Sequence, residues 1–180
     1  MAKWGLPEGV VESYRKKGIT SMFPWQEACL QCGSGAPLAG ANLVYSAPTS
    51  AGKTLVAEIL MIKVSLSPPG HRCTAPPSQR VLATGRKALL ILPFIALARE
   101  KMVYLQGVLA STGLRVGGFM ATTSPSGGLR GTDIAVATIE RANGLVNRMM
   151  EENQLETLSC VVVDEVILKT MVFSLAAKFE

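Results

Sequence analysis

The segment Ala47 to Thr54, with the sequence A-P-T-S-A-G-K-T, decides the fold of this chain. The apolar run Asn42 to Ala47 precedes it and predicts a strand. Thr54 to Val64 follows it with apolar residues at helical spacing, which predicts a helix. A strand, a loop of small residues and Gly-Lys-Thr opening a helix are typical of a phosphate loop. The sequence therefore predicts a site for a nucleotide triphosphate between this strand and this helix.

Each residue type in the loop suits that chemistry. Gly52 lets the backbone approach phosphate oxygens because it has no Cβ atom. The Lys53 ammonium reaches the β- and γ-phosphates, and the Thr54 hydroxyl ligates Mg²⁺. Ala47 stands where the common pattern has its first glycine. The backbone N–H groups and the positive end of the helix attract the phosphates. The candidate phosphate-binding residues are Ala47, Pro48, Thr49, Ser50, Ala51, Gly52, Lys53 and Thr54.

Composition points to one domain with a substantial core. The 180 residues are 48% hydrophobic and only 17% charged, and the net charge is +5. So few charges suit a sheet that is buried on both faces, and so apolar a chain is not disordered. The most apolar stretch, Ala88 to Ala98, is interrupted by Pro93 and is too short to span a bilayer. We therefore expect no contact with a membrane.

Apolar runs alternate with amphipathic segments along the chain. This alternation predicts an α/β fold with a mainly parallel sheet flanked by helices. A proline-rich stretch at Ser65 to Gly85 interrupts the pattern and reads as an irregular insert. Strands are expected at Asn42–Ala47, Lys87–Leu92, Arg115–Met120, Asp133–Thr138 and Cys160–Asp164, and helices at Glu8–Lys17, Pro24–Cys32, Thr54–Val64, Ile95–Leu109 and Glu140–Glu152.

A second motif completes the predicted nucleotide site. Val161 to Glu165 (V-V-V-D-E) reads as an apolar strand that delivers a carboxylate at its carboxyl end. In nucleotide triphosphatases such an Asp holds Mg²⁺ and the adjacent Glu orients and deprotonates water. Asp164 is therefore expected to share the metal with Thr54. Lys53 and Glu165 are the candidate catalytic residues.

Together these motifs resemble those of superfamily 2 helicases and, more narrowly, of DNA helicases of the DNA polymerase theta type. The resemblance extends from about residue 4 to residue 165, except for the proline-rich insert. It implies a RecA-like domain and the activity of an ATP-dependent DNA helicase, which hydrolyses ATP. The motifs that carry it are Phe23–Gln26, Tyr45–Thr54, Leu92–Phe94, Thr123–Ser126, Ala137–Leu145 and Val161–Glu165.

The resemblance also implies roles for further residues. Gln26 is similar to the glutamine that reads the adenine edge and so selects ATP. Pro93, Phe94, Thr138 and Arg141 fall in segments that touch the backbone of the tracked strand. The implied cofactors are ATP and Mg²⁺, and the implied partner is single-stranded or tailed DNA. A nuclear location and a role in DNA repair follow from the same resemblance.

The chain departs from the family pattern in three places. Ile167 stands where the family has a histidine, and residues 166–180 diverge from the family altogether. The insert at about 65–85 has no counterpart in the relatives considered. We therefore interpret residues 1–165 as an incomplete first RecA-like ATP-binding domain and residues 166–180 as a divergent tail. Because the second RecA-like lobe and its arginine fingers are expected partners, full helicase activity is not expected from this chain alone.

Two other classes of function fit parts of the pattern. The chain could be another phosphate-loop protein, such as a small-molecule kinase or a transport ATPase. Gln26 and the Asp164-Glu165 pair at a strand end favour the helicase interpretation over these. The chain could also be a truncated, non-catalytic splice or gene-model product that acts at most as a nucleotide- or nucleic-acid-binding module.

Overall fold

Parallel strands form a single sheet in the computed structural model, which describes residues 4–31, 41–48, 50–66 and 86–165. The order across the sheet is β2-β3-β1-β4, and every pairing is parallel. This arrangement confirms the predicted α/β class. The strands are β1 (Lys87–Leu92), β2 (Val116–Phe119), β3 (Ile134–Thr138) and β4 (Leu158–Val163).

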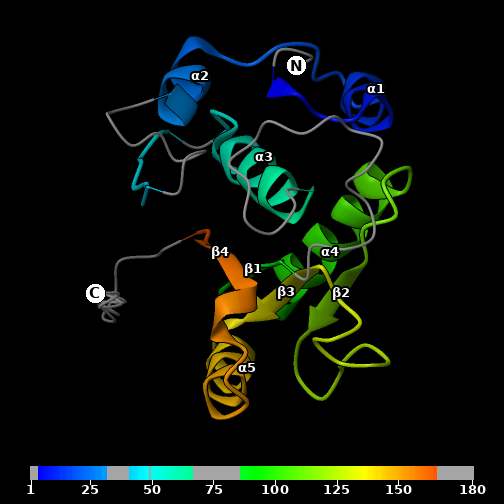
Figure 1. Ribbon diagram of the computed structural model, residues 1–180. Helices are drawn as coiled ribbons and strands as arrows, with labels where there is room; N and C mark the ends of the chain where they lie inside the picture. The colour runs from blue at the N-terminus through cyan, green and yellow to red at the C-terminus, as the bar shows by residue number, and fades with distance from the viewer. Residues whose placement is uncertain (1–3, 32–40, 49, 67–85, 166–180) are drawn as a thin grey trace.

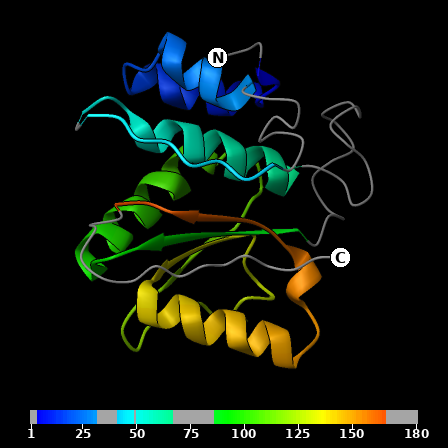
Figure 2. The same ribbon diagram turned by 90° about the vertical axis from the view of Figure 1, so that its left-hand side faces the viewer.

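Helices cover both faces of this sheet, but unequally (Figures 1 and 2). On one face α3 and α4 lie next to the strands, and α1 and α2 form an outer layer above α3 (Figure 2). Among the described helices, α5 is the one that covers the other face. The helices are α1 (Glu8–Lys16), α2 (Pro24–Gln31), α3 (Lys53–Leu66), α4 (Ile95–Leu109) and α5 (Ile139–Glu151), and a short 3-10 helix (Leu155–Thr157) precedes β4.

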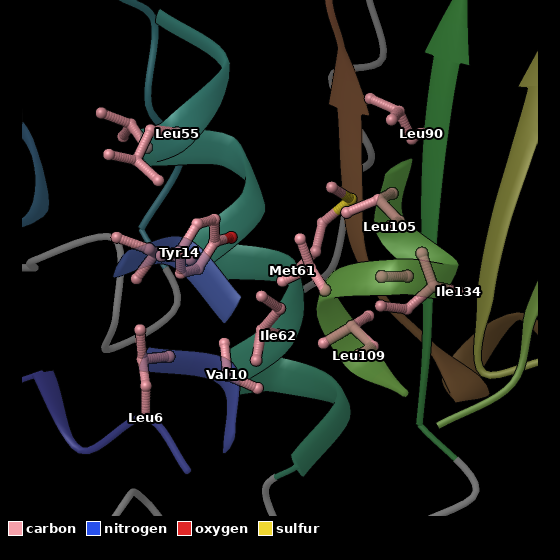
Figure 3. Close-up of a cluster of buried hydrophobic side chains, with 14 of the residues drawn as sticks. Leu6, Val10, Tyr14, Leu55, Met61, Ile62, Leu90, Leu105, Leu109 and Ile134 are labelled. Carbon is pink, nitrogen blue, oxygen red and sulfur yellow. The ribbon is translucent and has the colours of Figure 1, made fainter. Parts of the chain in front are cut away.

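Two hydrophobic clusters separate these layers. Successive side chains of a strand point to opposite faces. Along β1, Ala88, Leu90 and Leu92 accordingly join the larger cluster under α3 and α4, and Leu89 joins the smaller cluster under α5. Figure 3 shows the larger cluster between α1, α3, α4 and the strands. The labelled residues there are Leu6, Val10, Tyr14, Leu55, Met61, Ile62, Leu90, Leu105, Leu109 and Ile134.

The helix α3 is buried on nearly all sides because it lies between the outer helices and the sheet. Nine of its residues are buried, and it is apolar around most of its circumference, as expected of an internal helix. Its one buried carboxylate, Glu58, is an exception. Since α3 begins at Lys53, its rigid placement in the core fixes where the phosphate loop ends.

The structure corrects the expected strand at Asn42–Ala47. Residues 41–48 form neither helix nor strand, and Figure 2 shows them running alongside α3. Leu43 and Tyr45 pack against the core there, whereas Val44 is 98% exposed. A strand needs a neighbour that exchanges backbone hydrogen bonds with it, and the interior of a helix such as α3 has its backbone N–H and C=O groups paired internally. An apolar run alone therefore predicted the extended shape but not the pairing.

The other helix and strand boundaries differ only slightly from those expected from the sequence. Ser65 and Leu66 are the last residues of α3 rather than the start of the irregular insert. The rest of the insert, residues 67–85, and the tail 166–180 with Ile167 lie outside the described residues. At the edge of the sheet, β4 exposes Val161 and Val163 on the face that α5 covers. Within the described residues no helix is both long and apolar enough to cross a bilayer.

Candidate nucleotide and nucleic-acid site

The phosphate loop makes a tight turn just before α3. Ala51 N–H donates to the Pro48 carbonyl at 3.2 Å, and Ser50 and Gly52 adopt left-handed φ values of 65° and 75°. A Cβ atom on Gly52 would lie 2.7 Å from Gln26 Nε2, so only glycine fits both the conformation and the space. Thr49 lies outside the described residues. The structure therefore has a tight turn followed directly by a helix that begins at Lys53.

The Lys53 ammonium points back across the loop. Its Nζ donates to the carbonyl oxygens of Ala47 at 2.9 Å and Pro48 at 3.0 Å. These bonds tie the first residue of α3 to the segment before the turn. They also hold a positive charge over the loop, where an incoming anion can take the place of the carbonyl acceptors. Thr54, the next residue of α3, is half-buried beside it.

Gln26 joins α2 to this loop. Its side chain is buried, its Nε2 donates to the Gly52 carbonyl at 2.8 Å, and its Oε1 accepts from Phe23 N–H at 2.8 Å. The second bond satisfies a free N–H at the start of α2, where a helix lacks internal acceptors. The predicted base-reading residue is thus in direct contact with the phosphate loop.

Tyr45 connects the two halves of the site, and sequence reasoning missed its role. Its hydroxyl donates to the Lys53 carbonyl at 2.7 Å, and its ring lies 6.0 Å from that of Trp25. Burial, with the negative charge of Asp164 as the next cause, raises the pKa of Tyr45 to about 12. The sequence feature that could have indicated this role is the aromatic residue two positions before Ala47.

The carboxylate pair follows β4 as expected. Asp164 N–H donates to the Ile91 carbonyl at 3.1 Å, which fixes the strand end beside β1. Asp164 Oδ1 accepts from Glu165 N–H at 2.9 Å, and Glu165 is exposed with a left-handed φ of 56°. Among the described residues, no cluster of three or more histidine, cysteine or acidic side chains could hold a metal. Asp164 is half-buried beside the exposed Glu165.

The predicted nucleic-acid residues meet at the carboxyl end of neighbouring strands. Leu92 pairs with Thr138 in the β1–β3 ladder, so Pro93 and Phe94 lie beside the start of α5. Open α/β sheets bind ligands at this edge. Phe94 is 57% exposed, whereas Thr138 is buried. The Phe94 side chain is thus accessible to solvent, whereas that of Thr138 is not.

Arg141 lies in the first turn of α5 and is held in place there. Its Nη2 donates to Ser124 Oγ at 2.6 Å. Ser124 belongs to the loop after β2, so the bond joins that loop to α5. The two segments that the sequence singled out separately, around residues 123–126 and 137–145, are therefore in contact.

A buried polar cluster behind the loop was not predicted. The Glu58 carboxylate accepts from the Tyr14 hydroxyl at 2.9 Å and from Lys101 Nζ at 3.2 Å. Burial raises the pKa of Glu58, and the Lys101 charge opposes that rise without cancelling it. The cluster links α1, α3 and α4. A lone acidic residue inside the apolar sequence of α3 was the signal for it.

Comparison with known families identifies the domain. The DEAD/DEAH box helicase family matches residues 23–167. This chain belongs to the DEAD/DEAH box helicase family. The match includes the Gln26 segment, the phosphate loop and the Asp164-Glu165 pair. It confirms the helicase interpretation over the kinase and transport alternatives.

Two related proteins show which helicases this domain resembles within the family. DNA polymerase theta of Mus musculus is 53% identical over 165 residues, which cover 92% of this chain and 6% of the mouse protein. DNA polymerase theta of Drosophila melanogaster is 47% identical over 92% of this chain and 7% of the fly protein. The expected resemblance to the polymerase theta helicase region is thus confirmed. The chain spans less than a tenth of the length of either relative.

Solved structures confirm the fold of the helicase domain. A hypothetical ATP-dependent RNA helicase from Sulfolobus tokodaii superimposes with a TM-score of 0.58 at 17% sequence identity. The alignment covers 88% of this chain and 50% of that chain. At this identity the likeness concerns the fold alone, which is RecA-like.

Proposed function

We propose that this domain is the ATP-binding lobe of an ATP-dependent DNA helicase of the DNA polymerase theta type. Family membership implies ATP binding, and the names of the mouse and fly relatives support DNA as the nucleic acid. The observation that carries the proposal is the position of Tyr45. Its hydroxyl donates to the Lys53 carbonyl, and, besides burial, the charge of Asp164 contributes to its raised pKa, which supports a single site that includes the phosphate loop and the carboxylate.

The residues present fit a magnesium-bound triphosphate. Gly52 adopts the left-handed φ of 75° that the turn requires, and the Lys53 ammonium supplies positive charge. The Thr54 hydroxyl and the Asp164 carboxylate are oxygen ligands of the kind that Mg²⁺ prefers. Bound Mg²⁺ would neutralise charge on the phosphates. Glu165, exposed next to Asp164, would orient and deprotonate the attacking water.

Gln26 completes the proposal for the nucleotide. Because its amide already bonds to the Gly52 carbonyl, a base read by Gln26 would be coupled directly to the phosphate loop. The nucleic acid would cross the carboxyl edge of the sheet at Pro93, Phe94, Thr138 and Arg141. Of these, Phe94 would offer an exposed aromatic face for stacking with a base.

A titration with a fluorescent ATP analogue and Mg²⁺ tests the nucleotide half. Wild-type protein should bind, and Lys53→Ala should weaken binding at least tenfold because the loop loses its ammonium. Lys16→Ala is the matched control, since Lys16 is exposed on α1. Gln26→Ala should reduce the preference for the ATP analogue over the GTP analogue. Equal binding by wild type and Lys53→Ala would contradict the proposed site.

Fluorescence anisotropy with labelled oligonucleotides tests the nucleic-acid half. Single-stranded and tailed DNA should bind more tightly than blunt duplex, and Phe94→Ala should weaken binding of single-stranded DNA. The same proposal places the protein in the nucleus in DNA repair, which imaging of a fluorescent fusion before and after induced strand breaks would examine. A uniformly cytoplasmic signal would count against that part.

A further inference from the structure

A hollow of about 330 Å³ lies between α5 and the loop that follows β2. The residues that line it include three arginines and a single carboxylate: Arg130, Arg141, Arg148 and Glu152. The hollow therefore carries an excess of positive charge. Its position is separate from the phosphate loop, since α5 covers the opposite face of the sheet from α3 (Figure 2).

The α5 residues of the hollow form one stripe along the helix. Arg141, Leu145, Arg148 and the C-cap residue Glu152 are spaced by four, three and four residues, which places them on one side of the helix. Seven residues separate Arg141 from Arg148, a rise of about 10 Å along the axis. Arg141 lies at the carboxyl edge of the sheet, where the proposed nucleic-acid residues meet. The stripe thus continues from that edge down α5.

Two features favour the binding of an anion by these arginines. Arg141 Nε is buried and has no hydrogen-bond partner within the part of the chain that the structure describes. A buried N–H without an acceptor is costly, so an acceptor that enters the hollow gains that bond. Arg130 contacts Glu152 at 3.7 Å, but their side chains are 79% and 41% exposed. So exposed a pair is weak and exchanges readily for another anion.

We propose that this hollow binds backbone phosphates of a single-stranded nucleic acid, with Arg148 and Arg130 as contacts in addition to Arg141. The inference rests on the proposed function and extends its nucleic-acid path along α5. A guanidinium group matches a phosphate with paired N–H donors. Continuity with Arg141 favours a phosphodiester chain over an acidic peptide, because the same strand then reaches both arginines. Phosphate contacts of this kind add affinity without sequence preference.

The salt dependence of binding distinguishes a phosphate contact from a general loss of charge. Labelled oligodeoxythymidylate is titrated by anisotropy at several salt concentrations with wild type, Arg148→Gln, Arg130→Gln and Lys16→Gln. Each phosphate contact contributes about 0.7 to the slope of log K against log salt for a single strand. Arg148→Gln should lower the slope by about 0.7 and the affinity by about fivefold. Lys16→Gln, which removes the same charge on α1, should change neither.

Each outcome decides the proposal. Arg148→Lys should restore most of the slope, and circular dichroism and the urea midpoint should match wild type, because Arg148 is exposed. An unchanged slope in both arginine variants would overturn the proposal while leaving the proposed function intact. If wild type does not bind the oligonucleotide, both the proposed phosphate contacts and the proposed nucleic-acid binding are rejected. The ATP titration still tests the nucleotide site independently. If wild type binds labelled polyglutamate as tightly as the oligonucleotide, and Arg148→Gln loses that binding, the hollow is a site for an acidic peptide instead.

Discussion

Gln26 Nε2 donates a hydrogen bond to the Gly52 carbonyl oxygen at 2.8 Å, so a side chain of α2 holds the turn from which α3 begins. The same carbonyl accepts from Leu55 N–H at 3.2 Å in the first turn of α3. The Gly52 carbonyl oxygen is therefore held both by a side chain of α2 and by the first turn of α3. Any change that pushes Gln26 away should loosen the phosphate loop and the start of the helix together.

Gly52→Ala should destabilise the protein more than Gly18→Ala, although both glycines have a left-handed φ. A left-handed conformation costs a residue with a Cβ about 1–2 kcal/mol, and at Gly52 the new atom also meets Gln26 Nε2 at 2.7 Å. Gly18→Ala is the matched control, because its φ is +82° and no atom lies within 4 Å of the added Cβ. Urea denaturation of both variants measures the difference.

The Gln26 contact can be isolated with a double variant. Once Gln26→Ala removes the amide, Gly52→Ala loses its steric clash, so the two losses in free energy of unfolding should be less than additive. Strict additivity, or equal losses for Gly52→Ala and Gly18→Ala, would contradict the role of the contact.

The buried Glu58 carboxylate should make stability fall as pH rises. Burial raises its pKa above the ordinary 4.5, so the folded state holds a proton that the unfolded state releases. That stabilisation is complete below about pH 4.5 and is lost as pH rises through the folded pKa, with a slope of up to about 1.4 kcal/mol per pH unit. The charged or titratable groups that interact with it are Tyr14, Tyr45, Lys101, Tyr104 and Asp164.

Glu58→Gln isolates this effect because an amide does not ionise. Urea denaturation between pH 4.5 and 8 should show the variant gaining stability relative to wild type as pH rises. Tyr14→Phe is the companion variant, since it removes the 2.9 Å hydrogen bond but keeps the carboxyl group. A difference between wild type and Glu58→Gln that is constant across this range would rule out a raised pKa.

Local patterns predicted most of the elements in this fold. The continuous apolar run K-A-L-L-I-L became β1, which is paired on both sides and buried on both faces. The start of α3 at Lys53 followed from the loop motif. Such features depend on neighbours in sequence, and for that reason they can be identified from the sequence alone. The family motifs also placed Gln26 next to the loop that it contacts.

Contacts between distant segments were not predictable in the same way. Tyr14 and Glu58 are 44 residues apart, and nothing near either residue specifies the other. The run at Asn42–Ala47 has the composition of a strand, but its backbone has no strand beside it. Whether an apolar segment pairs or only packs depends on which edge it meets in the folded chain. Exposure of Phe94 and burial of Thr138 likewise depend on the layers above the sheet.

The Arg115–Asp133 pair should make stability fall at acidic pH. Partial burial would raise the pKa of Asp133, but hydrogen bonds from the Arg115 backbone and guanidinium outweigh it and the pKa is lowered from 3.8. A lowered pKa gives stability that is present above the unfolded pKa and is lost as pH falls through the folded one. Asp133→Asn should therefore cost up to about 1 kcal/mol at pH 7, because the pair is partly exposed.

That cost should shrink as pH falls below about 3.8, because the Asp133 carboxylate then takes up a proton more readily in the unfolded chain and wild type loses the stabilisation. Thermal unfolding monitored by circular dichroism at pH 3 and pH 7 compares the two proteins. Glu156→Gln is the control, since it removes one carboxylate from an exposed position and should cost little stability at either pH. A deficit of Asp133→Asn that stays the same at both pH values would show that the ion pair is not its cause.

Gly117→Ala should be more damaging than Gly118→Ala, although the two glycines are adjacent in β2. A Cβ on Gly117 would lie 2.7 Å from Thr132 Oγ1 and 2.8 Å from Pro125 Cγ, both in short or rigid side chains. A Cβ on Gly118 would meet the flexible ends of Met102 and Met120, which can move aside. Overpacking at Gly117 should cost about 1–3 kcal/mol.

The same clash has a consequence for the arginine hollow. Pro125 and Thr132 belong to the loop that forms one wall of that hollow, and Thr132 Oγ1 donates to the Gly128 carbonyl at 3.0 Å. Gly117→Ala should therefore weaken oligonucleotide binding as well as lower the urea midpoint, whereas Gly118→Ala should leave binding unchanged. If both variants unfold at the same urea concentration and bind equally, the loop does not depend on the close approach at Gly117.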